Sequence, residues 1–220
     1  MWTKRRGSQC LRQILSDKEK AKVKKGYIII LVIVLLVIIL AGGIIGRYNK
    51  MRVLKVNVQE AWGQVENQYQ RRFDLVPNLV STVQGAANFE KNTLTAVIEA
   101  RSKVGQMTIT PETLSDPQAF QKFQQAQDGL SSALSRLMVV VERYPDLKAN
   151  QNFLQLQDQL EGTENRIATE RVRFNDSVKL LNQYVVVFPN NLLAGMFGIK
   201  EMPFFQASSG ADMAPKVQFE

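Results

Sequence analysis

The sequence predicts an all-α protein, in which a single N-terminal transmembrane helix precedes an elongated antiparallel helical bundle. An unbroken apolar run occupies 28–45, and beyond it apolar side chains recur mostly every three or four residues. Strand-like alternation is confined to YVVV at 184–187, which we assign to a helix end. We divide the chain into a basic tail at 1–26, a transmembrane helix at 27–46, a bundle domain at 47–189, an apolar C-terminal segment at 190–206 and a tail at 207–220 that we expect to be disordered.

The apolar run is long enough to cross a bilayer. Ile28, Leu36 and Ile45 mark its start, middle and end, and no charged or polar side chain lies between them. As a helix the run rises about 27 Å, close to the ~30 Å thickness of the hydrocarbon core. A cleaved signal peptide is the alternative, but the run is long for one and no A-x-A site follows it. We therefore predict a membrane anchor.

The positive charge is concentrated before this anchor. The formal net charge is +8, yet residues 1–26 hold nine basic and two acidic side chains, while residues 47–220 hold 19 and 18. Because cationic residues near a span stay in the cytoplasm, we expect a cytoplasmic N-terminus and an extracytoplasmic bundle in the inner (cytoplasmic) membrane of a bacterial cell. The same distribution argues against nucleic acid as a partner and favours the lipid bilayer.

The composition excludes several classes of enzyme. There is no histidine, and the single cysteine, Cys10, lies in the basic tail. This excludes Ser–His–Asp and Cys–His nucleophile systems, histidine-containing zinc sites and intramolecular disulfides. Neither a phosphate-binding glycine loop nor a calcium-binding loop is present. We therefore predict no catalytic residue, no metal and no cofactor, and interpret the chain as non-enzymatic.

The first helical stretch after the anchor covers about 53–73, and the anchor can continue into it because no Pro or Gly lies within 47–55. Trp62 is predicted to anchor the core. Arg71, Arg72 and Asp74 predict an i,i+3 charge pair. Pro77 predicts a kink or a short break, because proline has no N–H to donate. A second helix follows at about 79–103.

The segment 105–117 is the clearest loop. A third helix at about 118–144 ends before Pro145, because the residue before a proline avoids the α region. The last long helix has a heptad-like seam over 153–188, in which Thr163 and Glu170 are polar members. Asn150 or Asn152 is expected to cap it.

Several ordered motifs resemble the LemA family. They are AW at 61–62, RRFDLVPNLV at 71–80, EAR at 99–101, ERYPDLKANQNFLQLQDQLEGTENRIA at 142–168 and FPN at 188–190. The resemblance implies an all-helical bundle behind a single span, with no established activity and no catalytic residue to transfer. It also implies a membrane protease or a TPM-domain protein as a candidate partner. The long basic tail departs from the family's short leader, and its charge predicts the orientation given above.

Two features predict association. Gly42 and Gly46 form a G-x-x-x-G pattern, which lets two transmembrane helices approach closely. The segment after Pro189 carries more apolar area than a monomer usually exposes. We predict an oligomer or partner contact at Leu192, Leu193, Met196, Phe197, Ile199, Phe204 and Phe205. Folding back onto the bundle and lying in the membrane interface are the alternatives for this segment.

These features predict a membrane-anchored, non-catalytic helical-bundle protein that forms a homo-oligomer and serves as an envelope scaffold or interaction protein. One alternative is a sensory or adaptor module that signals through its span. Another is an extracytoplasmic solute-binding module.

Overall fold

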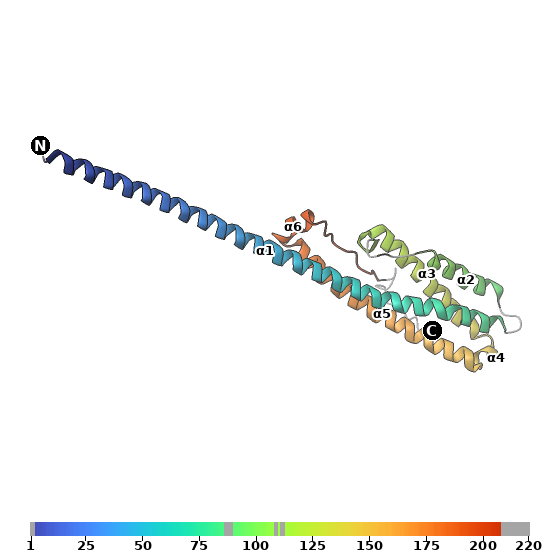
Figure 1. The fold of residues 1–220 in the computed structure, drawn as a ribbon. Helices are drawn as coiled ribbons and strands as arrows, with labels where there is room; N and C mark the ends of the chain where they lie inside the picture. The colour runs from blue at the N-terminus through green and yellow to red at the C-terminus, as the bar shows by residue number, and fades with distance from the viewer. Residues whose placement is uncertain (1–2, 86–89, 108–109, 111–112, 208–220) are drawn as a thin grey trace, which may run out of the picture. The chain divides into compact units, whose positions relative to one another are not determined.

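The computed structural model describes residues 3–85, 90–107, 110 and 113–207, and this part of the chain contains helices and no strand (Figure 1). The elements are α1 (Thr3–Gln84), α2 (Lys91–Gly105), the 3-10 turn η1 (Thr113–Ser115), α3 (Pro117–Val141), α4 (Pro145–Lys148), α5 (Gln151–Val186) and α6 (Asn190–Met196). The chain divides into two compact units, Met1–Lys50 and Met51–Glu220, and α1 contributes to both. The predicted all-α class with an apolar N-terminal helix is confirmed.

The first unit contains the predicted anchor. Leu36 is 54% exposed and Ile45 is 58% exposed, and the large apolar side chains between them along α1 are exposed as well. By length and composition, α1 is the one helix in the described part of the chain that is apolar enough to cross a membrane. An apolar surface all round a helix fits a membrane anchor.

Some predictions fall outside the described residues. They concern the side chains of the basic tail at 1–26, the side chain of Ile28, and the tail beyond Ala207. Gly42 and Gly46 are described, and a Cβ built at either would meet nothing within 4 Å. Their small-residue surface is therefore uncovered in this structure, and the helix–helix contact stays a prediction.

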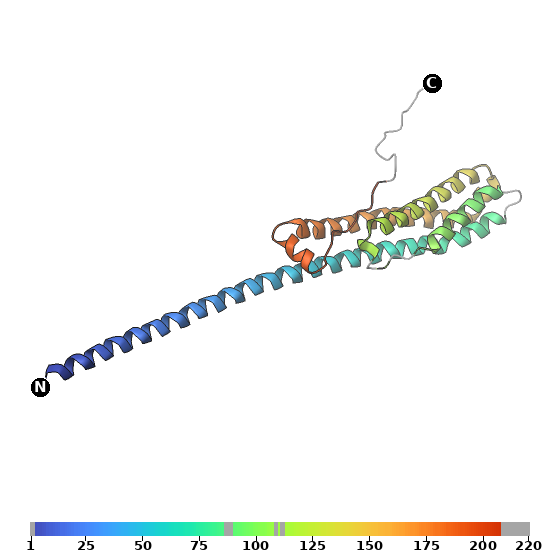
Figure 2. The same ribbon diagram turned by 90° about the horizontal axis from the view of Figure 1, so that it is seen from above.

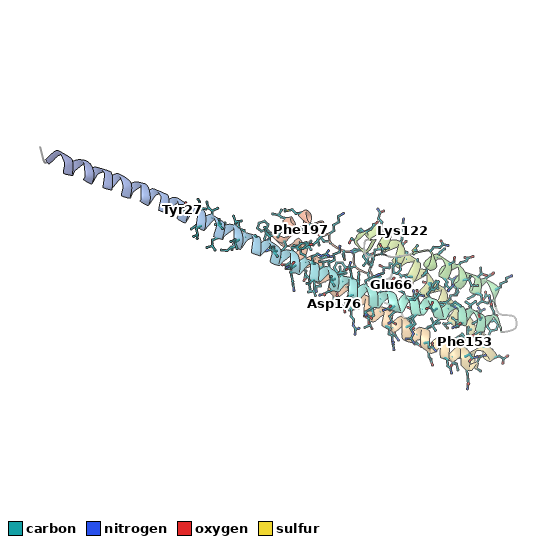
Figure 3. All side chains as sticks on the ribbon, in the orientation of Figure 1. Tyr27, Glu66, Lys122, Phe153, Asp176 and Phe197 are labelled. Atoms are coloured by element: carbon teal, nitrogen blue, oxygen red, sulfur yellow. The ribbon has the colours of Figure 1, made fainter. Side chains whose placement is uncertain are left out.

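The second unit is an antiparallel bundle. From Met51 onward α1 runs in one direction, α2 returns, α3 runs forward again and α5 returns, as Figures 1 and 2 show. The first core cluster gathers around Trp62, and the second around Leu79, Leu137 and Phe153. Figure 3 labels Phe153 at one end of this bundle and Phe197 at the other.

Trp62 is a core anchor, as predicted. Its side chain is 4% exposed. Its ring centroid lies 5.4 Å from that of Phe123 and 5.7 Å from that of Phe174, both in edge-on geometry, and 6.2 Å from that of Phe205, which is stacked. Aromatic pairs in this distance range stabilise one another beyond their burial alone. The cluster joins α1, α3, α5 and the C-terminal segment.

Pro77 does not break α1, so the predicted alternative of a short break is wrong. Proline cannot donate to the carbonyl of Phe73, four residues before it. The Nε of Arg101 on α2 donates to that carbonyl at 3.3 Å instead. The guanidinium of Arg101 also lies 3.9 Å from the centroid of the Phe73 ring. A neighbouring helix thus supplies the donor that proline lacks.

The helix ends follow ordinary capping chemistry. The Asp116 side chain accepts from the backbone N–H groups of Gln118 at 2.9 Å and Ala119 at 3.3 Å, with Pro117 at the first position of α3. Asn150 is the residue that caps α5: its Oδ1 accepts from the backbone N–H of Asn152 at 2.9 Å. Both helices therefore begin within two residues of their predicted starts.

The seam of α5 is confirmed over most of its length, and its predicted end is wrong. Thr163 is buried, and its hydroxyl donates to the Gln159 carbonyl at 2.7 Å, so this polar side chain is satisfied within its own helix. Glu170 is half-buried. Phe188 lies beyond the end of the helix at Val186 and is exposed.

Candidate functional site

The C-terminal segment folds back along the bundle as an extended strap, which we define as residues 199–206. Ile199, Met202 and Phe205 of the strap are buried in the first core cluster, at 3–7% exposure. Lys200 and Glu201, between the first two, are exposed. Buried side chains thus recur every third residue, so one face of the strap lies against the protein.

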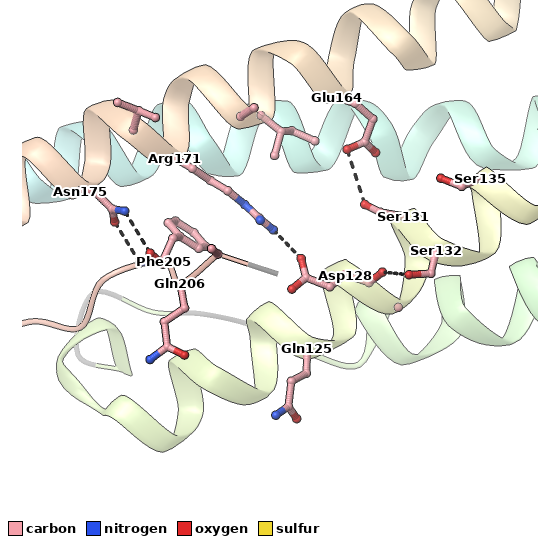
Figure 4. Close-up of a pocket in the computed structure, with 15 residues that line it drawn as sticks. Gln125, Asp128, Ser131, Ser132, Ser135, Glu164, Arg171, Asn175, Phe205 and Gln206 are labelled. Carbon is pink, nitrogen blue, oxygen red and sulfur yellow. Dashed lines mark hydrogen bonds and ion pairs between the residues drawn. The ribbon is translucent and has the colours of Figure 1, made fainter. Parts of the chain in front are cut away.

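Three side-chain amides hold the strap by its backbone, and we call them the amide ladder. The Asn182 amide donates to the Met202 carbonyl at 2.8 Å, and its oxygen accepts from the Met202 N–H at 2.9 Å. The Asn175 amide makes the same pair of bonds to Phe205, at 3.1 and 2.9 Å (Figure 4). On α3, Gln124 repeats this arrangement with Gln206, at 2.7 and 3.2 Å.

The spacing of the ladder suits an extended chain. Asn175 and Asn182 are seven residues apart on α5, a rise of about 10.5 Å. Met202 and Phe205 are three residues apart, which an extended chain covers in about 10 Å. Both asparagines therefore lie on one helix face, in register with Met202 and Phe205 of the strap.

A second polar arrangement is buried inside the bundle. Arg72 on α1 is 1% exposed. Its Nη1 donates to the Ser131 hydroxyl and to Glu164 Oε1, both at 2.6 Å. Its Nη2 donates to the backbone carbonyl of Gln127 at 3.4 Å and to the side-chain oxygen of the same residue. The predicted charge pair with Asp74 is therefore wrong for Arg72, which instead joins α1, α3 and α5.

Next to this arginine lies a second one, Arg171 on α5. Its Nε donates to the Tyr69 hydroxyl at 2.6 Å, and its Nη2 donates to Asp128 Oδ1 at 3.0 Å. Its guanidinium also lies 4.9 Å from the centroid of the Phe205 ring. Arg171 thus connects the polar interior with the strap.

Burial and charge act in opposite directions on this pair. Burial raises the pKa of the Tyr69 hydroxyl above 10.0, although the nearby Arg171 charge opposes the rise. Burial by itself would lower the pKa of Arg171, but Tyr69 and Asp128 raise it above its ordinary value. At neutral pH the tyrosine is therefore protonated and the arginine is charged.

Arg171 lines a groove between α3 and α5, with a volume of about 1080 Å³ (Figure 4). The strap closes one end of it through Phe205 and Gln206. The positive charge of Arg171 is matched by Asp128, and Glu164 is paired with Arg72. Within the described residues, no group of three or more acidic side chains gathers to hold a metal. The groove therefore offers hydrogen bonds rather than a strong net charge.

The residues predicted for an oligomer or partner contact separate into two sets. Ile199 and Phe205 lie in the core through the strap, and Leu193 packs partly against it. Leu192 is 61% exposed, Met196 is 77% exposed, and Phe197 and Phe204 are also exposed. With two exposed side chains just after α5, part of this set forms what we call the α6 patch, defined as Val187, Phe188, Leu192, Met196 and Phe197.

Sequence reasoning missed the amide ladder and the buried role of Arg72. The signal for Arg72 was its place on the apolar stripe, three residues after Tyr69 and four before Val76. The ladder left no comparable signal, since asparagines seven residues apart on a polar face also fit a solvated surface.

Comparison with known proteins relates the chain to one protein family and to three individual proteins. The model of the LemA family matches residues 61–219. The chain is similar to the magnetosome proteins MamQ 1 and MamQ 2 of Paramagnetospirillum magneticum, each 26% identical over 185 residues, covering 77% of this chain and 68% of the relative. It is also similar to the magnetosome protein MamQ of Magnetospirillum gryphiswaldense, 25% identical over the same length and shares.

Proposed function

This chain belongs to the LemA family, and from that premise we propose that it is a membrane-anchored, non-catalytic bundle protein that self-associates as an envelope scaffold or interaction protein. In this proposal the span holds the bundle at a membrane, and the basic charge before the span supports an orientation with the tail in the cytoplasm and the bundle outside. The lipid bilayer is the first partner, and a second copy of the chain is the next.

The observation that carries the proposal is the α6 patch. Leu192 and Met196 lie four residues apart and so share one face of α6, and Phe188, two residues beyond the end of α5, is 74% exposed. Large apolar side chains concentrated over a few consecutive residues are typical of protein–protein contacts. These exposed side chains lie outside the core, to which α6 contributes Ala194 and the strap contributes Ile199.

Anchoring strengthens such a contact. Two copies in one bilayer meet at a far higher effective concentration than two free proteins, so a modest apolar patch suffices. Gly42 and Gly46 leave an uncovered small-residue surface on the span, where two transmembrane helices can approach. The two contacts would act together.

The charges in the groove support a non-catalytic role. A general base needs a carboxylate that is free to take a proton. Glu164, the acid nearest Ser131, is paired with the buried Arg72 at 2.6 Å, and Asp128 is paired with Arg171 at 3.0 Å. Both carboxylates therefore already have a cationic partner.

The test is the native mass of the full chain in mild detergent. We expect a defined oligomer that dissociates in the Leu192→Ser/Met196→Ser variant. The matched control is Val139→Ser/Val172→Ser, which removes two similarly exposed apolar side chains outside the patch and should leave the mass unchanged. A monomer in the wild type would refute self-association. Co-purification of a membrane protease or a TPM-domain protein would instead identify the occupant of the patch.

The groove supports a second candidate function, the binding of a small polar solute outside the cytoplasm. Its hydroxyl and amide groups, including Ser132, Ser135 and Gln125, suit a neutral, hydrogen-bonding molecule. Amino acids, sugars and nucleosides would be titrated against the melting temperature of the full chain. A rise that Ser135→Leu abolishes would support this function, and no rise with any of them would argue against it.

A further inference from the structure

We propose that the amide ladder is a peptide-binding site, and that the strap of a second copy of this chain occupies it, so that two copies exchange straps. The inference rests on the proposed self-association in so far as two copies must meet. It adds a second contact, made by residues outside the α6 patch, and names its chemistry: an extended peptide recognised through its backbone.

The ladder recognises a backbone and not a side chain. Each amide both donates to a carbonyl and accepts from an N–H of one residue, at Met202, Phe205 and Gln206. Any extended residue offers this pair of groups, except proline, which has no N–H. This is how a protein binds an extended peptide, with its affinity coming from main-chain bonds and its specificity from pockets for alternate side chains.

Two pockets supply the specificity. Phe205 enters the aromatic cluster, with its ring centroid 4.8 Å from that of Phe120 and 5.3 Å from that of Phe174. Arg171 lies over the same ring. Met202, three residues earlier, is 3% exposed. The ligand class is therefore an extended segment with a large apolar residue followed, three positions later, by an aromatic one.

The strap of a second copy meets this specification, because every copy carries the same sequence. Exchange of straps between two copies requires only that the backbone just before the strap take a different direction. That connection passes through Gly198, whose φ of +66° is a conformation that other residues rarely adopt. Gly198, Lys200 and Glu201 are exposed, so the new path breaks few contacts. Both copies would be held in one membrane, which favours the encounter.

The test uses full chains in which Cys10, the single natural cysteine, is replaced by serine. One tagged chain carries Gln124→Cys and a differently tagged chain carries Gln206→Cys, and the two are co-expressed in one membrane. A short bis-maleimide crosslinker is then added. We expect a crosslinked heterodimer, because Gln124 contacts Gln206 only where a strap is seated. The matched control pairs Gln206→Cys with Arg136→Cys, an exposed residue on α3.

The expected yield for the 124–206 pair is about fivefold or more above the control, since a seated strap holds the two thiols together. A yield no higher than the control would overturn strap exchange, provided that a single chain with both cysteines crosslinks internally. If Gln124→Cys does not fold, Gln121→Cys replaces it, because this exposed residue lines the same surface hollow as Gln206. The native mass of the same samples separates the two proposals: an oligomer without the crosslink refutes exchange alone, and a monomer refutes both.

Discussion

Glu164 on α5 accepts a hydrogen bond of 2.6 Å from Arg72 on α1, a residue 92 positions earlier in the chain and only 1% exposed. The pair lies between the two apolar core clusters and joins α1 to α5. It connects two of the stretches that resemble LemA motifs, 71–80 and 142–168. A buried charge paired in this way fixes which faces of the helices meet.

Loss of one partner should cost more than loss of both. Glu164→Leu leaves the Arg72 charge buried without its carboxylate. We expect the free energy of unfolding to fall by about 1–3 kcal/mol, less than for a fully buried pair because Glu164 is 38% exposed. The double variant Arg72→Met/Glu164→Leu should recover part of this loss. Urea unfolding of the full chain in detergent measures all four proteins of the cycle, and simple additivity would contradict the coupling.

The bond between Arg101 and the Phe73 carbonyl can be tested through Pro77. Arg101→Met keeps an apolar stem against the Phe73 ring but removes the donor, and we expect a cost of about 1 kcal/mol. In a Pro77→Ala background the new N–H of residue 77 donates to that carbonyl, so the same change should cost much less. Thermal unfolding measures the difference.

The control for this cycle is Arg136→Met, an exposed arginine on α3, which should cost the same with or without Pro77. An equal cost of Arg101→Met in both backgrounds would show that the ring contact, and not the hydrogen bond, supplies the stabilisation.

Local chemistry explains what could be predicted from the sequence. The span, the order of the helices, the buried Trp62 and the cap at Asn150 all depend on residues close together in the chain. The continuity of α1 through Pro77 could not be predicted, because its missing donor comes from Arg101 on another helix. The burial of Arg72 and the seating of the strap likewise depend on partners between 20 and 92 residues away.

Alkaline pH should destabilise the bundle through Tyr69. Its pKa is raised above 10.0 by burial, so above that pH the unfolded state loses this proton before the folded state does. The unfolded state then binds fewer protons, and the free energy of unfolding falls as pH rises. We expect the fall between about pH 10 and 11 to be steeper in the wild type than in Tyr69→Phe. Denaturant unfolding across this range measures it, and parallel curves would contradict the prediction.

Replacing one side-chain amide of the ladder with a carboxyl group should release the strap in a pH-dependent way. In Asn182→Asp the carboxylate can still accept from the Met202 N–H, but it has no hydrogen to donate and faces the Met202 carbonyl oxygen. We expect faster hydrogen exchange at the Met202 and Phe205 amides at pH 7, compared with the wild type. Below about pH 4 the protonated acid can donate again, so the difference, corrected for intrinsic exchange rates, should shrink. Asn165→Asp, an exposed site on the same helix, should leave both amides protected at either pH. Unchanged exchange in Asn182→Asp would show that the apolar pockets hold the strap without the ladder, and backbone recognition would then have no basis in this chain.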